Sequence, residues 1–188
     1  MKSFLLLAFI ALASCLSGEW TKHSLAEYNI YIEGAFTESF KVYANDENVD
    51  PDNFVRLSAF SQVVNGTNYR VCFIDRNKSL SIQEFIIYVP LQTSNKIGPI
   101  FKVLSKRVIE TKFLSLNFKE AYDFLEKYIY KEIYKIGEKI YKIYSAYHCE
   151  NINNIFYIVI TEYEKVHQEY VIVRDKSTKE FDHFDKIK

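Results

Sequence analysis

Apolar residues follow first a helical and then a strand-like spacing in the first half of the chain. They recur every three or four positions at Leu25, Tyr28, Ile32, Phe36, Phe40 and Tyr43. This spacing places them on one face of a helix, and Ser24 with Glu27 has the form of a capping box at its start. Gly34 lies within this helix and weakens it by about 1 kcal/mol relative to alanine. We therefore predict one long helix here.

Strand-like segments follow the predicted helix. They are rich in β-branched and aromatic residues and lie at about 54–62, 68–75, 82–89 and 100–109. In the second segment, alternation puts Tyr69, Val71 and Phe73 on one face and Arg70, Cys72 and Ile74 on the other. The economical packing is an antiparallel sheet with one face covered by the helix.

The second half of the chain repeats this order. Asn117 with Glu120 forms a second capping pattern, and the apolar stripe after it contains Phe118, Ala121, Leu125, Tyr128 and Ile129. Strands are predicted at about 139–147, 155–164 and 169–175.

Short sequences also recur between the halves. Ser58-Ala59-Phe60 reappears as Ser145-Ala146-Tyr147, and the segment 83–87, QEFII, reappears at nearly the same separation as 168–172, QEYVI. Internal similarity of this kind indicates a duplicated domain. We predict an α+β fold in which an antiparallel sheet wraps around one long helix, in two tandem copies at 18–107 and 108–188.

Residues 1–17 have the three-part form of a secretory signal. Lys2 precedes the apolar run Phe4 to Ala13, and small residues follow at Ser14, Cys15 and Ser17. The run is too short to span a bilayer, and cleavage after Ser17 would leave Gly18 as the first residue. The rival interpretation is a bacterial lipoprotein signal that leaves a lipidated Cys15. We expect an exported protein, secreted or in a lysosomal or vacuolar lumen, with no membrane attachment after cleavage.

Composition and charge narrow the function classes. The chain has 188 residues, of which 48% are hydrophobic, so it has ample material for a packed core. Its 24 basic and 24 acidic residues are interspersed and give no net charge, which argues against nucleic-acid binding. After cleavage two cysteines remain, Cys72 and Cys149, and they form neither a disulfide framework nor a zinc-site spacing.

The sequence contains no motif that is typical of an enzyme. Cys72 lies in the middle of a predicted strand and Cys149 in a polar loop, so neither has the setting of a nucleophile. The adjacent pair His148-Cys149 is better explained as side chains on opposite faces of a strand. Gly-rich phosphate loops, serine elbows and metal motifs are absent from the sequence. We predict a protein that is not an enzyme and needs no cofactor or metal.

The segment Gln62–Tyr69, QVVNGTNY, combines two valines with Asn-Gly, a strong hairpin-turn signal. It resembles the Gln-Xaa-Val-Xaa-Gly hairpin of the cystatins, which inhibit papain-like cysteine proteases. The order also resembles theirs: Gly18 near the expected mature N-terminus, a helix, then this hairpin. The resemblance covers 18–107 well and 108–188 only through the repeat.

The resemblance implies a cystatin-like fold and a function as a reversible, tight-binding inhibitor of papain-like, cathepsin-like cysteine proteases. In that family an N-terminal segment and two hairpin loops block the active-site cleft. The residues implied to contact the protease are Gly18, Trp20, Gln62, Val63, Val64, Asn65, Gly66, Pro90 and Leu91. Buried valine contributes about 1.5 to 3 kcal/mol, and glycine permits close backbone approach. The competing interpretation of the motif is an ordinary hairpin turn with two incidental valines.

The chain departs from the cystatin pattern in several places. Its only Trp is Trp20, so the second hairpin lacks the Pro-Trp of many members, and Val89–Gln92 is more similar to the Leu-Pro-Gly loop of the stefin branch. It also lacks the two disulfides of secreted members. At the position equivalent to 62–66, the second copy reads Cys149-Glu150-Asn151-Ile152-Asn153, and the motif is gone. These departures leave one alternative: a secreted cystatin-fold binding module without protease inhibition.

Two sequons for N-glycosylation, at Asn65 and Asn77, complete the candidate sites. A glycan on Asn65 would obstruct the predicted inhibitory hairpin, and the motif itself also generates this sequon without any modification.

Overall fold

The computed structural model describes residues 18–78, 80–91, 98–113, 119–137 and 142–187. The predicted signal, residues 1–17, and the predicted cap at Asn117 lie outside the described residues. The contacts between residues divide the chain into two compact units. Unit 1 contains the chain up to Phe73 together with Gln83–Arg107, and unit 2 contains Ile74–Ile82 together with Val108–Lys188. The segment 74–82 therefore belongs with the second half of the chain.

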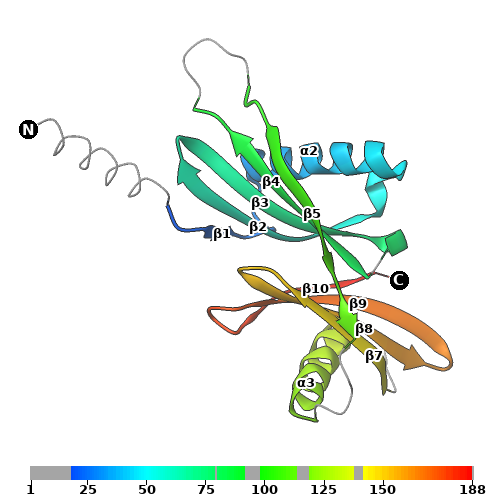
Figure 1. The fold of residues 1–188 in the computed structure, drawn as a ribbon. Coiled ribbons are helices and arrows are strands. Elements are labelled where there is room, and N and C mark those ends of the chain that lie inside the picture. The colour runs from blue at the N-terminus through cyan, green and yellow to red at the C-terminus, as the bar shows by residue number, and fades with distance from the viewer. Residues whose placement is uncertain (1–17, 79, 92–97, 114–118, 138–141, 188) are drawn as a thin grey trace, which may run out of the picture. The chain divides into compact units, whose positions relative to one another are not determined.

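The first sheet has five antiparallel strands, and one helix packs on it (Figure 1). The elements in chain order are β1 (Thr21–His23), α2 (Ile30–Glu47), β2 (Phe54–Val64), β3 (Gly66–Asp75), β4 (Ser81–Val89) and β5 (Lys102–Glu110), with short 3-10 turns at Pro51–Asn53 and Arg76–Lys78. The strands lie in the order β1-β2-β3-β4-β5, so each strand neighbours the next one along the chain.

The second sheet also has five strands in chain order. Its elements are β6 (Lys112–Phe113), α3 (Lys119–Lys135), β7 (Lys142–Glu150), β8 (Asn154–Tyr163), β9 (Val166–Asp175) and β10 (Phe181–Lys186). The pairs β6–β7, β7–β8, β8–β9 and β9–β10 are all antiparallel.

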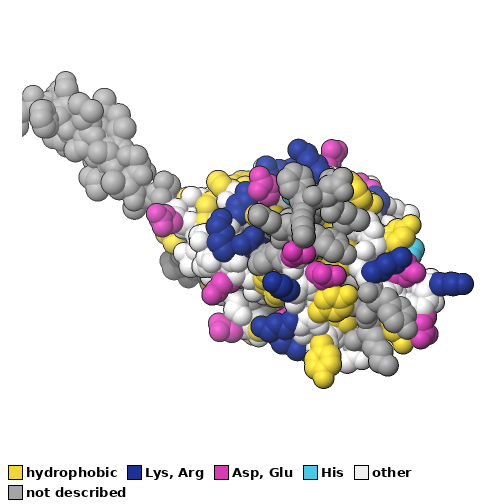
Figure 2. Space-filling view, turned by 90° about the horizontal axis from the view of Figure 1, so that it is seen from below, with side chains coloured by type: hydrophobic (Ala, Val, Ile, Leu, Met, Phe, Trp, Pro, Cys, Tyr) yellow, Lys and Arg dark blue, Asp and Glu magenta, His cyan; other side chains and the backbone are white. Residues whose placement is uncertain are grey.

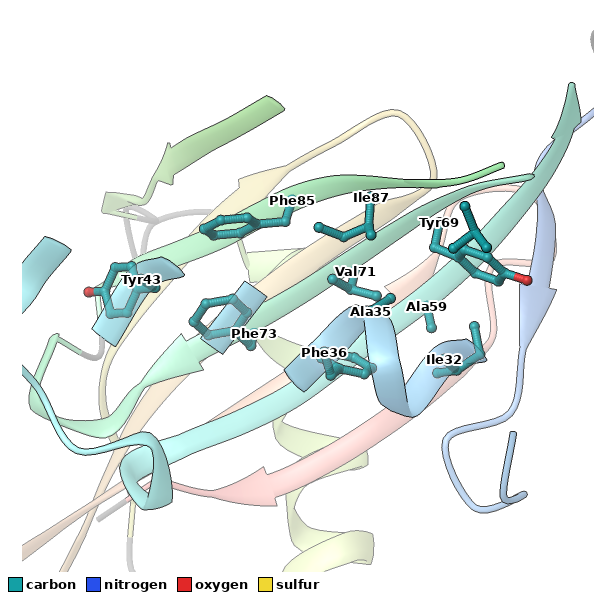
Figure 3. Packing of buried hydrophobic residues seen from close by; sticks show 11 residues of the cluster. Ile32, Ala35, Phe36, Tyr43, Ala59, Tyr69, Val71, Phe73, Phe85 and Ile87 are labelled. Carbon is teal, nitrogen blue, oxygen red and sulfur yellow. The ribbon is translucent and has the colours of Figure 1, made fainter. Parts of the chain in front are cut away.

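Helix α2 covers one face of the first sheet. Figure 3 shows Ile32, Ala35, Phe36 and Tyr43 of the helix facing side chains of β2, β3 and β4. The sheet residues of this core are Ala59, Tyr69, Val71, Phe73, Phe85, Ile87 and Val89. The predicted alternation of Tyr69, Val71 and Phe73 toward the helix is thus confirmed. In unit 2, Leu125, Ile129 and Ile133 of α3 make the matching contact with Ile143, Ala146, Val159, Tyr170 and Ile172.

The predicted fold, an antiparallel sheet wrapped around one long helix in two tandem copies, is wrong. Two five-stranded antiparallel sheets dominate the described residues, and their two α-helices are short, with 18 and 17 residues. The physical reason lies in the strands. Every residue of β3 from Tyr69 to Asp75 is buried, so the sheet is covered on both faces. The helix covers only one of those faces, and the sheet does not curl around it.

Charged side chains are mixed on the surface. On the face shown in Figure 2, both basic and acidic side chains are scattered over the surface, in keeping with the balanced charge of the sequence. Neither helix in the described ranges has both the length and the apolar content of a bilayer span.

Candidate functional site

The predicted motif forms the tight turn between β2 and β3. Strand β2 ends at Val64, β3 begins at Gly66, and Asn65 alone lies between them. Gly66 has φ +118°, a conformation that side-chain-bearing residues rarely adopt. Val63 is 64% exposed, Asn65 is exposed, and Gln62 and Val64 are half-buried. Of the two valines, Val63 is therefore the one that offers apolar surface to a partner.

The end of β4 lies against this turn. A Cβ added to Gly66 would come 2.6 Å from the carbonyl oxygen of Val89 and 2.7 Å from the ring of Tyr88. The Tyr88 hydroxyl donates a hydrogen bond to the Asn65 carbonyl. Glycine at 66 therefore permits a close approach that alanine would prevent. The chain continues from Val89 to half-buried Pro90 and to Leu91, which is 67% exposed.

The N-terminal segment lies on the other side of the turn. The Gly18 amide donates to the Val63 carbonyl at 2.9 Å. Strand β1 pairs antiparallel with β2 from Thr21 to His23, and His23 Nε2 lies 2.7 Å from Ser61 Oγ. Burial lowers the pKa of His23, which favours the neutral imidazole in this contact.

Eight of the nine predicted contact residues therefore meet at one end of the first sheet. We call this set the unit 1 hairpin end, and its members are Gly18, Gln62, Val63, Val64, Asn65, Gly66, Pro90 and Leu91. It has no ionisable side chain and presents exposed aliphatic surface at Val63 and Leu91. Such a surface can bind through shape and desolvation and offers no group for proton transfer.

Trp20, the ninth residue, makes a different contact. Its ring centroid lies 4.0 Å from the guanidinium carbon of Arg70, and Trp20 is half-buried. Sequence reasoning missed both Arg70 and Tyr88, which hold parts of the site in place. Arg70 had one signal, because it is a charged residue flanked by the apolar and aromatic residues Tyr69 and Val71 in the middle of a strand.

The corresponding turn of unit 2 has different chemistry. The Asn151 side-chain oxygen accepts from the amides of Asn153 and Asn154, which shapes the turn between β7 and β8. The Lys176 amide donates to the Asn153 carbonyl, and its Nζ lies 2.8 Å from Glu150 Oε2. Ile152 is 67% exposed. We call Cys149–Asn153 with Lys176 the unit 2 hairpin end.

Neither cysteine takes part in a disulfide. Cys72 Sγ lies 3.9 Å from Glu84 Oε2 inside unit 1. The sequence offered two placements for Cys149, a polar loop and, with His148, a strand. The strand is correct and the loop is wrong, because β7 continues to Glu150 and buries the thiol. Burial raises the pKa of Cys149 to about 12, so the thiol is protonated at neutral pH.

The remaining candidates are quickly placed. Asn77 is exposed in the 3-10 turn after β3, and Ser79 of its sequon lies outside the described residues. Within the described ranges, no three His, Cys, Asp or Glu side chains gather as a metal site would require.

Comparison of the chain with protein-family models, with curated proteins and with solved structures finds no match.

Proposed function

We propose that the unit 1 hairpin end blocks the active-site cleft of a papain-like, cathepsin-like cysteine protease, reversibly and without a chemical step. The observation that carries the proposal is the convergence of three separate segments, namely the hairpin of β2 and β3, the N-terminal segment and the end of β4. The end of β4 contacts Asn65 through the Tyr88 hydroxyl and lies close to Gly66. The Gly18 amide donates to the carbonyl of Val63, two residues before Asn65. The resemblance of Gln62–Gly66 to the cystatin hairpin names the class of protease.

The exposed side chains favour binding in an apolar cleft. Val63 and Leu91 are each about two-thirds exposed in the free chain and have apolar surface to bury. Burying one such side chain contributes about 1.5 to 3 kcal/mol, so two of them account for a useful part of a tight complex. Because Asn65 and Gly66 are uncharged, docking leaves no stranded charge in the cleft.

The turn is also held in place before binding. The hydrogen bond from Tyr88 and the close packing of Gly66 on Val89 fix the turn on one side. The Gly18–Val63 hydrogen bond fixes it on the other. A rigid binding loop loses little conformational entropy on association, and this supports tight inhibition by a small surface.

Titration of active papain with the full chain tests the proposal. We expect stoichiometric loss of activity that returns after dilution or displacement, because no covalent bond forms. A chain that is folded by circular dichroism and leaves papain fully active at micromolar concentration would contradict it. Binding to papain with an alkylated catalytic cysteine, without inhibition of the active enzyme, would instead identify a binding module.

Val63→Ser and a control variant test the contribution of exposed apolar surface to inhibition. The substitution removes exposed apolar surface without adding charge, so we expect weaker inhibition and unchanged stability. Val166→Ser is the control, because Val166 is 59% exposed and belongs to unit 2.

A further inference from the structure

Trp20 lies against the buried side chain of Arg70. Arg70, in the middle of β3, is only 8% exposed, and the Trp20 ring covers its guanidinium group at 4.0 Å. Contacts of this kind combine cation–π attraction with the burial of a large ring. Trp20 is therefore directed onto the sheet.

A buried glutamate neutralises the charge of this arginine. Glu84 of β4 is 4% exposed, and its Oε2 lies 4.0 Å from Arg70 Nε. Its second oxygen accepts a hydrogen bond from Arg107 Nε at 2.6 Å. Charged groups as buried as Arg70 and Glu84 persist only when they are paired, so Glu84 favours a buried position of the guanidinium group next to the indole.

The backbone contacts of the N-terminal segment are few. Strand β1 has three residues, and beyond it Gly18 makes one backbone hydrogen bond to Val63. Thr21 and Lys22 are exposed, and His23 is half-buried. Short terminal strands with exposed hydrogen bonds open readily, so backbone pairing alone holds this segment weakly.

We propose that Trp20 is a positioning residue, which clamps the N-terminal segment onto Arg70 and so keeps Gly18 beside Val63. The role of this contact in inhibition rests on the proposed function. The contact between Trp20 and Arg70 itself is a property of the free chain. Without it, Gly18 leaves the Val63 carbonyl, and the binding surface loses one of its three segments.

Fluorescence tests the clamp directly, because Trp20 is the only tryptophan of the chain. We expect acrylamide to quench the full chain weakly and the Arg70→Lys variant more strongly, since lysine keeps the charge beside Glu84 and lacks a flat guanidinium face. Arg174→Lys is the matched control: Arg174 lies 5.9 Å from the ring of Phe181 in unit 2, and the change should leave quenching unaltered. Equal quenching of the parent chain and Arg70→Lys would overturn the proposal.

Amide hydrogen exchange provides a second measurement that does not require an altered arginine. In Trp20→Ala we expect faster exchange at the amides of β1 that bond to β2 and an unchanged circular dichroism spectrum, and Trp20→Phe should recover most of the protection. Unchanged exchange in Trp20→Ala would overturn the clamp even if Arg70→Lys failed to fold.

Inhibition then separates the clamp from the proposed function. Trp20→Ala should weaken inhibition of papain about tenfold, with rescue by Trp20→Phe, which keeps a ring over the cation. If the parent chain does not inhibit papain but its quenching and exchange behave as expected, the clamp stands and the proposed function fails. If exchange rises in Trp20→Ala while inhibition is unchanged, Gly18 takes no part in inhibition and the positioning role is refuted.

Discussion

At the unit 1 hairpin end, Val63 near the end of β2 and Asn65 in the turn are exposed. At the unit 2 hairpin end, the turn after β7 exposes Ile152 beside the ion pair of Glu150 and Lys176. Both turns join the second and third strands of a five-stranded sheet. Each turn also contacts the region of the fourth strand of its sheet. In unit 1 this contact comes from Tyr88 at the end of β4, and in unit 2 it comes from Lys176, directly after β9. The same position in the two sheets therefore carries an uncharged surface in one unit and a charged one in the other.

This difference has a clear energetic consequence. An apolar side chain gains free energy when it enters a cleft, but an exposed ion pair must first give up its water, and the desolvation penalty can exceed what contacts return. A binding function that depends on desolvation therefore suits unit 1 and does not suit unit 2. Four predictions break or sharpen this comparison.

The largest effect is expected from a charge on the exposed valine. Val63→Asp would carry an unpaired carboxylate into the cleft and should weaken papain inhibition by about 3 kcal/mol or more, roughly a hundredfold. Ile152→Asp is the matched control, because Ile152 is as exposed as Val63 but lies in the other turn. The measurement is the papain inhibition constant of each variant. An equal loss of affinity in the two variants would contradict the assignment of inhibition to the unit 1 hairpin end.

Gly66→Ala should reduce the free energy of unfolding. Alanine at φ +118° is strained, and its Cβ would meet the Val89 carbonyl, so we expect a loss of about 1 to 3 kcal/mol in urea denaturation. Gly137→Ala tests strain alone: Gly137 has φ +75° and nothing within 4 Å of an added Cβ. If Gly66→Ala loses no more unfolding free energy than Gly137→Ala, the close contact between β4 and the turn does not contribute to the effect.

The positions before the two turns also differ. Cys149 corresponds in the repeat to half-exposed Gln62, but its thiol is buried and its pKa is raised to about 12. Because the folded pKa is the higher one, the stabilising effect is full below the ordinary thiol pKa and is lost as the pH rises toward about 12. We expect Cys149→Ala to lose less unfolding free energy between pH 8 and pH 11 than the parent chain.

Alkylation provides the control for this prediction. Iodoacetamide at pH 8 should leave Cys149 of the folded chain unmodified and should modify the cysteine in Gln62→Cys. Rapid modification of Cys149 under native conditions, detected by mass spectrometry, would contradict the burial of this thiol.

The smallest effect concerns the ion pair. The hydrogen bond and charge of Lys176 hold the pKa of the Glu150 carboxyl below its ordinary value. The associated stability is present above the ordinary pKa and is lost as the pH falls through the lowered one, and it is small because the carboxyl is exposed to water. In Lys176→Met, NMR titration should show the Glu150 pKa rise toward its ordinary value. An unchanged pKa would mean that the pair does not form in solution.

Strand positions could be predicted because the apolar and β-branched runs are long. The predicted strand 68–75 lies within β3, Gly66–Asp75, and the predicted strand 82–89 nearly coincides with β4, Ser81–Val89. Strand β10 escaped prediction because FDHFDK has few apolar residues, a composition that suits an edge strand.

The start of the first helix could not be predicted from its local pattern. Ser24 and Glu27 match a capping box, but Thr21–His23 pair with β2, so the chain needs several residues to pass from the sheet to the helix. The helix begins at Ile30, and the side chain of Asn29 accepts from the amides of Tyr31 and Ile32. Pairing with a distant strand overrides the local signal.

Gly34 shows a similar limit. Local propensity treats it as a weak point of the helix, but a Cβ there would lie 2.0 Å from the ring of Phe101. The glycine makes room for an aromatic ring that is distant in the sequence. In the candidate site, the motif identified the turn itself, whereas Tyr88 and Arg70 act through contacts that only the folded sheet creates.

The assignment of Ile74–Ile82 to unit 2 affects how the protein is made and how it is degraded. Arg76 Nη1 donates to the carbonyls of Lys186 and Ile187, and Thr111 Oγ1 donates to the carbonyl of Leu80. On the ribosome, Arg76 is synthesised long before these two carbonyls, so these hydrogen bonds of Arg76 form only after residue 187 has emerged. A stop codon before residue 186, or proteolytic cleavage before that residue, would therefore disturb a segment that connects two strands of the first sheet.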